Sequence, residues 1–193
     1  AATGVSERAL LQLSLGDMAN HALILALVLG WVASMRRGSD FRVPTFQFVA
    51  VGIVLVAIAA PSGLLLALPA IGNYLDGSVF VTGQLHYVAV GGVLLALLAG
   101  LHEAWPQLAS RDVHHGRAAL ALGLFALGTN LAFFPMLAMG VAGVPRPLPM
   151  LPVDALNLQA ASALGAVLSF AAVALFAWNF VATLVPEEPV PAR

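Results

Sequence analysis

The residue with the clearest capacity for chemistry is His86, which stands alone in the apolar stretch "VTGQLHYVAVGG" of residues 81–92. Imidazole is the commonest metal-ligating side chain, and its charge changes near neutral pH. An ionisable group deep in a membrane span is unfavourable unless it is paired, so it is a functional candidate by default. A neutral histidine can also serve as a hydrogen-bonding contact between helices. The position of His86 alone leaves both roles open.

The composition indicates what kind of element holds this histidine. Of the 193 residues, 61% are hydrophobic and 9% are charged, and the mean hydropathy is +0.96. A soluble domain has roughly a quarter of its residues charged, whereas long uncharged apolar runs indicate membrane spans. The chain has no cysteine and no lysine, and its net charge is −1. This composition excludes a disulfide framework and a thiolate metal site, and it offers no basic surface for nucleic acid.

Five segments reach the length of about 20 apolar residues that crosses the hydrocarbon core of a membrane. They are too long for strands and do not alternate with period two, so we predict an all-α integral membrane protein with a five-helix transmembrane bundle. We assign residues 1–17 to an outer-side N-terminal segment, residues 18–185 to the transmembrane domain and residues 186–193 to a cytoplasmic tail. The five segments are roughly Met18–Met35, Phe46–Ala70, Val79–Trp105, Ala118–Ala142 and Leu156–Val185.

The connectors between these spans carry almost all of the charge. Six of the eight arginines fall on one predicted side, and the other two are Arg8 and Arg146. The positive-inside bias therefore predicts that the N-terminus is outside and the C-terminus is cytoplasmic. At the cytoplasmic end of the third span, Trp105 is expected to be an interfacial anchor. Three histidines fall at or beyond that end: His102, His114 and His115. We expect His114 and His115 to be solvated loop residues.

Polar and small residues inside the spans predict contacts between helices. Asn130 and Asn179 are expected to bridge helices, with contact to a cofactor as the less favoured role. Glycines in the third and fourth spans are expected to allow ordinary close packing. These glycines are Gly91, Gly92, Gly100, Gly123 and Gly128.

Several separate motifs resemble the last five helices of subunit I of the heme-copper oxidases, the cytochrome c oxidase family. They are "GWVASMRRGSDFRVPTFQF", "HYVAVGGVLLALLAGLHEAWPQL", "GTNLAFFPMLAMGVAGVPRPLP" and "LNLQAASALGAVLSFAAVALFAWNF". Their order and spacing agree with the family along most of the chain. The resemblance implies a multi-pass subunit of a respiratory electron-transport complex, and we expect it in a bacterial-type inner (cytoplasmic) membrane.

In that family the third of these helices carries two histidines separated by one residue. Two positions on an α-helix are about 200° apart, so the two side chains leave on opposite faces and one helix can hold a heme on each flank. The first histidine is the proximal ligand of the high-spin heme beside copper, and the second ligates the low-spin heme. The corresponding residues here are Gln84 and His86. The resemblance therefore implies that His86 is a heme-iron ligand and that the high-spin ligand position is vacated.

Other positions also depart from the family pattern. Leu27 and Ile24 stand where the family has a lysine and a threonine for proton uptake, and a hydrophobic pair cannot pass a proton. Asp76 is followed by Gly77, so the outer-face histidine-aspartate pair that helps to bind magnesium is incomplete.

The resemblance also implies which parts of the heme sites lie elsewhere. Of the paired arginines that contact heme propionates, Arg146 remains, and its neighbour is Pro147. The copper ligands and the other low-spin ligand belong to earlier helices, so no copper is expected in this chain. We therefore expect a half or diverged subunit I that cannot form the oxygen-reducing centre alone. It would associate with other membrane subunits, including a chain that supplies the missing N-terminal helices.

Three readings of this pattern stay open. In the first, His86 supplies one axial ligand to a low-spin heme that is shared with a partner chain, and Arg146 lies near a propionate. In the second, the chain is a heme-free structural subunit derived from an oxidase, and His86 is a buried hydrogen-bonding residue. In the third, which the shortage of intramembrane charge disfavours, the chain is part of a transporter or channel. His21 is not expected to supply a second ligand, because its helix lies toward the high-spin flank in the family.

Overall fold

The computed structural model of the chain describes residues 43–146 and 153–185, together with the isolated residues 15, 19 and 22. The predicted first span, the N-terminal segment and the C-terminal tail lie outside this range apart from those three residues. His21, Ile24 and Leu27 are among the residues outside it. Within the described ranges every regular element is helical, and the single β contact there is an isolated bridge between Ser78 and Pro145.

Four long helices form the bundle. Each is long and apolar enough to cross a membrane. They confirm four of the predicted spans to within a few residues at each end. Three of the helices are α2 (Pro44–Ala67), α6 (His115–Val141) and α7 (Leu156–Leu184). The fourth is continuous and consists of α4 (Val79–His86), the π-helical segment η1 (Tyr87–Leu94) and α5 (Leu95–Ala109). The short α3 (Pro69–Leu75) and η2 (Val153–Ala155) lie in connectors.

Local sequence explains where these helices begin and end. Pro44 and Pro69 occupy the first turns of α2 and α3, where a missing backbone N–H is tolerated. The hydroxyl of Ser78 caps α4 by accepting a hydrogen bond from the backbone N–H of Phe80 at 3.2 Å. Ser110 ends α5 in the left-handed conformation, with a φ of 55°. These signals fix the length of the helix that carries His86.

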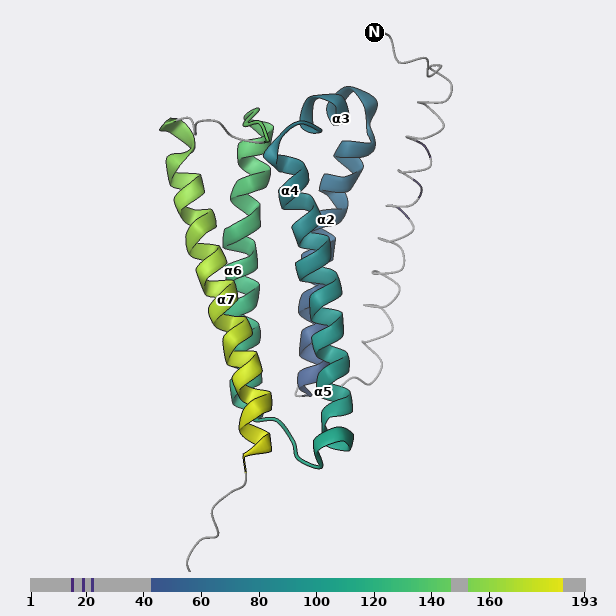
Figure 1. The fold of residues 1–193 in the computed structure, drawn as a ribbon. Coiled ribbons are helices and arrows are strands. Elements are labelled where there is room, and N and C mark those ends of the chain that lie inside the picture. The colour runs from purple at the N-terminus through teal and green to yellow at the C-terminus, as the bar shows by residue number, and fades with distance from the viewer. Residues whose placement is uncertain (1–14, 16–18, 20–21, 23–42, 147–152, 186–193) are drawn as a thin grey trace, which may run out of the picture.

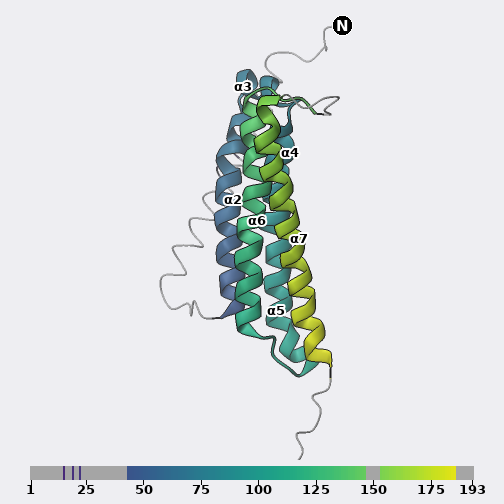
Figure 2. The same cartoon turned by 90° about the vertical axis from the view of Figure 1, so that its left-hand side faces the viewer.

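The helices are arranged as two pairs. Figure 1 shows α6 and α7 side by side, with α2 and the α4–η1–α5 helix as the second pair, and the view in Figure 2 shows the same bundle from its side. Contacts of α6 with α4 and α2 join the two pairs. The centre of the bundle is filled by large side chains that are almost completely buried, among them Phe48, Leu55, Tyr87, Phe125 and Phe176.

Close packing of the helices depends on some of the predicted glycines. A Cβ atom added at Gly91 would lie 2.7 Å from the Cβ of Leu55, so α2 and η1 approach each other at this point. A Cβ at Gly128 would lie 2.7 Å from atoms of Ser169, which brings α6 and α7 together in the same way. Gly100 and Gly123 have no such neighbour within 4 Å among the described residues, and the packing predicted for them is not seen there.

Candidate functional site

His86 is the last residue of α4, and its side chain lies on the exposed surface of the described bundle. Its Nδ1 atom is 2.7 Å from the backbone carbonyl oxygen of Thr82, one helical turn earlier. A carbonyl oxygen can only accept a hydrogen bond, so the neutral ring carries its proton on Nδ1. The lone pair is therefore on Nε2, and no hydrogen bond to Nε2 is formed within the described residues.

Helix α6 fixes the imidazole from one side. The rings of His86 and Phe133 lie 4.8 Å apart between centroids, with an interplanar angle of 37°. Gly83 allows this approach, because a Cβ atom there would lie only 3.0 Å from the carbonyl oxygen of Phe133. The hydrogen bond to Thr82 and this ring contact together restrict the orientation of the imidazole.

Arg146 reaches the same face of the molecule. The backbone N–H of Arg146 donates to the carbonyl oxygen of Gly77 at 2.8 Å, which ties the segment after α6 to the start of α4. The guanidinium group then donates to the hydroxyl of Thr82 at 3.3 Å. Thr82 thus contacts both candidate residues, through its carbonyl to His86 and through its hydroxyl to Arg146. The structure brings together the two residues that the sequence analysis selected.

Gln84 faces the opposite side of the helix, as the two-residue spacing predicts. Its side chain is buried and lines a cavity of about 390 Å³ between α4–η1 and α2. Within the described part of the chain, its amide forms no hydrogen bond. The other residues that line this cavity are apolar: Val56, Ala59, Ala60, Leu85, Val88, Ala89 and Val93.

The π-helical segment begins at Tyr87, directly after His86. Such segments are rare and often occur at functional sites, because they displace the residues that follow from their ordinary helical positions. The hydroxyl of Tyr87 donates to the side-chain oxygen of Asn130 at 3.1 Å, which confirms that Asn130 bridges two helices. The sequence analysis missed the π segment, and the adjacent glycines Gly91 and Gly92 were the signal that could have indicated it.

The histidines at the other end of the bundle differ from what the sequence predicted. His102 lies within α5 and is buried among the rings of Phe48, Phe176 and Phe180, with centroid distances of 4.5, 5.9 and 4.8 Å. His114 and His115 are exposed, as predicted, but they begin a helix: the His114 ring accepts a hydrogen bond from the backbone N–H of Arg117 at 3.2 Å and caps α6, whose first residue is His115. His86, at the other end, is exposed within the described bundle.

Clusters that could bind a metal ion by themselves are absent from the described ranges. No group of three or more histidine, cysteine or acidic side chains comes together there. The site is therefore one imidazole with an outward Nε2 atom, supported by a backbone carbonyl, an aromatic ring and a nearby guanidinium group. Such a site can supply one ligand to a metal centre whose other ligands come from elsewhere.

Comparison with known proteins identifies the family. The model of the family described as "Cytochrome C and Quinol oxidase polypeptide I" matches residues 3–168. The chain belongs to this family. Cytochrome c oxidase subunit 1 of Bacillus sp. (strain PS3) is 34% identical to this chain over 169 residues, which cover 85% of the chain and 27% of the relative. Cytochrome c oxidase subunit 1 of Bacillus subtilis (strain 168) is 32% identical over 158 residues, with coverages of 80% and 25%.

The fold comparison agrees with this assignment. A solved structure described as a cryo-EM structure of a heme-copper terminal oxidase dimer superposes with a TM-score of 0.77 at 19% sequence identity. The match covers 97% of this chain and 39% of that chain. The chain is therefore an all-helical, multi-pass membrane protein with the fold of part of an oxidase subunit I. It spans about a quarter of the length of the Bacillus relatives.

Proposed function

We propose that this subunit I-like protein supplies one axial ligand, Nε2 of His86, to a low-spin heme in a respiratory membrane complex of the heme-copper oxidase type. The observation that carries the proposal is the 2.7 Å contact between His86 Nδ1 and the Thr82 carbonyl oxygen. That contact assigns the proton to Nδ1 and leaves the ligating lone pair directed away from the helix. A bound heme would supply a one-electron redox centre.

The surroundings of His86 favour a ligand role over plain packing. The ring lies on a helix that can span a membrane, on its exposed face, where an unpaired polar atom is unfavourable in lipid. Coordination of iron by Nε2 would satisfy this atom. The Thr82 carbonyl would act as the hydrogen-bond partner that metal-ligating histidines typically have on their second ring nitrogen, because it fixes the orientation of the ring.

Arg146 is suited to hold an anionic substituent beside this ligand. Its guanidinium is exposed, and its one side-chain hydrogen bond within the described residues is the 3.3 Å contact with Thr82. Most of its five donors are therefore available, and a charge-assisted pair with a heme propionate is stronger than a neutral hydrogen bond. Only one such arginine is present, because Pro147 follows it in the sequence.

The Gln84 flank is not proposed to hold a heme. An amide is a poor axial ligand, and the side chain faces a cavity lined by apolar residues. Copper ligands and the second axial ligand would come from helices outside this sequence, and we expect no copper to be bound by this chain. A heme-free structural subunit is the second candidate, and the loss of the imidazole at Gln84 is the observation that favours it.

The test is the visible spectrum of the purified membrane complex with His86 replaced. We expect His86→Ala to abolish the six-coordinate low-spin signal and to reduce the heme recovered by pyridine extraction. Because the ring is exposed, its removal leaves no buried cavity in this chain, and the complex should still assemble. His86→Met should retain heme with a raised midpoint potential, since thioether ligation stabilises the reduced iron.

The matched control is His115→Ala, which removes an exposed histidine from the opposite end of the bundle. This variant should keep the spectrum and heme content of the unmodified complex. An unchanged spectrum in the assembled His86→Ala complex would exclude the ligand role and leave the structural subunit as the function.

A further inference from the structure

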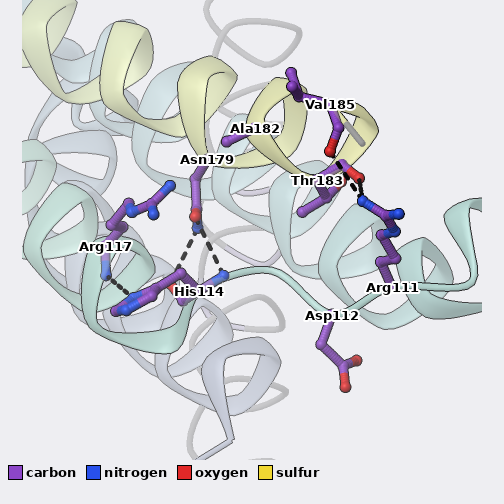
Figure 3. Close-up of a pocket in the computed structure, with 8 residues that line it drawn as sticks. All are labelled: Arg111, Asp112, His114, Arg117, Asn179, Ala182, Thr183 and Val185. Carbon is purple, nitrogen blue, oxygen red and sulfur yellow. Dashed lines mark hydrogen bonds between the residues drawn. The ribbon is translucent and has the colours of Figure 1, made fainter. Parts of the chain in front are cut away.

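A second cavity, which has a polar lining, lies at the opposite end of the bundle from Arg146. It has a volume of about 510 Å³ and opens between the beginning of α6 and the end of α7. Figure 3 shows the side chains around it, with arginines on either side of Asn179 and Thr183. The lining residues with a polar role are Arg111, Asp112, His114, Arg117, Asn179 and Thr183.

Arg111 is held in place by the end of α7. Its Nη1 atom donates to the carbonyl oxygens of Thr183 and Val185 at 3.1 and 3.0 Å. These two bonds satisfy carbonyl groups that have no partner within the helix. A guanidinium group has five N–H donors in a planar fork, so three donors of Arg111 remain for another ligand.

Arg117 contributes a second cationic group from the first turn of α6. Its backbone N–H is used for the cap with His114. Its guanidinium group forms no hydrogen bond or ion pair within the described residues, and the residue is half-buried. The carboxylate of Asp112 points away from both arginines in Figure 3. The cavity therefore has excess positive charge that the described chain does not neutralise.

Two hydrogen bonds between Asn179 and His114 join α7 to the connector on one side of the cavity. The side-chain oxygen of Asn179 accepts from the backbone N–H of His114 at 3.2 Å, and its nitrogen donates to the carbonyl oxygen of His114 at 3.1 Å. Asn179 is 1% exposed, so these two bonds are protected from water. This pair confirms that Asn179 links a helix to another segment, and it fixes the spacing between α7 and the connector that carries both arginines.

The position of the cavity along the helices matches the surface of a membrane. It lies where α6 begins and α7 ends, and both helices are long and apolar enough to span a bilayer. The indole nitrogen of Trp105 donates to the hydroxyl of Thr183 at 2.9 Å beside the cavity. Tryptophan gathers at the level of the lipid headgroups, where its ring is in an apolar layer and its N–H in a polar one.

We propose that this cavity binds the phosphate group of an anionic phospholipid. Phosphate matches the planar donor fork of arginine, and basic pockets between membrane helices on the cytoplasmic side are suited to lipid headgroups. The positive end of the α6 dipole adds to the attraction. Exposed apolar residues on the same two helices, Leu120, Leu127 and Val181, can accommodate acyl chains, which a free phosphate ion lacks.

The test is lipid binding to the delipidated membrane complex, measured by native mass spectrometry in detergent. Phosphatidylglycerol should bind more tightly than phosphatidylcholine, and Arg117→Gln should weaken phosphatidylglycerol binding about tenfold, the effect of losing one charge-assisted hydrogen bond. Arg117 is the primary variant because its guanidinium group forms no hydrogen bond or ion pair in the described chain. Arg146→Gln removes the same charge at the other end of the bundle and should leave this binding unchanged.

Two results would overturn the proposal. One is a failure to select the anionic headgroup or its cation, seen either as equal binding of phosphatidylglycerol and phosphatidylcholine or as a phosphatidylglycerol binding constant that Arg117→Gln does not change. The other is displacement of the lipid by inorganic phosphate at equal concentration, which would assign the cavity to a soluble anion. The Arg111→Gln variant should weaken binding as well, and a circular dichroism spectrum will show whether the loss of its two backbone contacts has also unfolded the end of α7.

Discussion

Gln84 and His86 lie on opposite flanks of the α4–η1–α5 helix, and the two flanks differ in their surroundings. On the His86 flank, the imidazole is exposed, its proton is fixed on Nδ1 by the Thr82 carbonyl, and Phe133 and Arg146 lie beside it. On the Gln84 flank, the side chain is buried against α2 and faces an apolar cavity of about 390 Å³. The first flank carries exposed polar groups, and the second carries a buried amide side chain beside an apolar cavity.

Under the proposed function, one ligand position is lost while its neighbour is kept, and the two flanks have different supports. The contacts of His86 come from α4 itself and from α6, and the side chain of Arg146 contacts the same Thr82 that holds the imidazole. The contacts on the Gln84 side come from α2. Leu55 of α2 can approach because residue 91 of η1 is a glycine. Because different helices support the two flanks, a change in the packing of α2 need not disturb the imidazole.

The largest expected effect is on the packed flank. Gly91→Ala would place a Cβ atom 2.7 Å from the Cβ of Leu55, so α2 must move. We expect the free energy of unfolding to fall by about 1–3 kcal/mol, the usual consequence of overpacking. The low-spin spectrum should persist, because the hydrogen bond and the ring contact that hold His86 come from α4 and α6. Thermal denaturation followed by both helix content and heme absorbance would measure the two effects separately.

Gly100→Ala is the matched control, since no heavy atom among the described residues lies within 4 Å of an added Cβ there. This variant should be neutral or slightly stabilising, because alanine favours helix over glycine. Loss of the heme signal in Gly91→Ala at temperatures where the helices remain folded would show that the flanks are coupled, contrary to the comparison above.

A smaller effect is expected from the charge on the His86 flank. Arg146→Gln removes a cation near the proposed heme, and a nearby positive charge stabilises the reduced, less positive form of the iron. The midpoint potential should therefore fall, on the order of tens of millivolts for a partly solvated charge. Arg146→Lys keeps the charge and should retain most of the potential. If a redox titration gives the same midpoint potential for the unmodified protein, Arg146→Gln and Arg146→Lys, then Arg146 does not interact with the proposed heme.

Much of the fold was predictable because membrane helices are determined by long apolar runs. The four described spans begin and end within a few residues of the predicted limits. The opposite directions of Gln84 and His86 follow from helical geometry alone. The pairing of His86 with a backbone acceptor could also be anticipated, since Thr82 lies one turn earlier on the same helix.

Other features depend on tertiary contacts that a single sequence does not reveal. The π-helical segment after His86 replaces ordinary helical hydrogen bonds over Tyr87–Leu94, and only the adjacent glycines indicate it. His102 was expected at the membrane surface, but α2 and α7 supply three phenylalanine rings that bury it. The two hydrogen bonds between the Asn179 side chain and the His114 backbone join residues 65 positions apart, and they lie at the second cavity.

The smallest expected effect is at Gln84 itself. Its side chain lines the apolar cavity and its amide forms no hydrogen bond in the described chain, so an apolar side chain of similar size would break no interaction there. Gln84→Leu should leave the spectrum unchanged and raise the free energy of unfolding by no more than about 1 kcal/mol. Asn130→Leu is the matched comparison, because that amide accepts a hydrogen bond from the fully buried Tyr87, and its loss should destabilise the protein by about 1–3 kcal/mol. If Gln84→Leu destabilises the protein as much as Asn130→Leu does, the amide of Gln84 has a hydrogen-bond partner. The Gln84 flank would then hold its side chain by a specific polar contact and not by apolar packing alone.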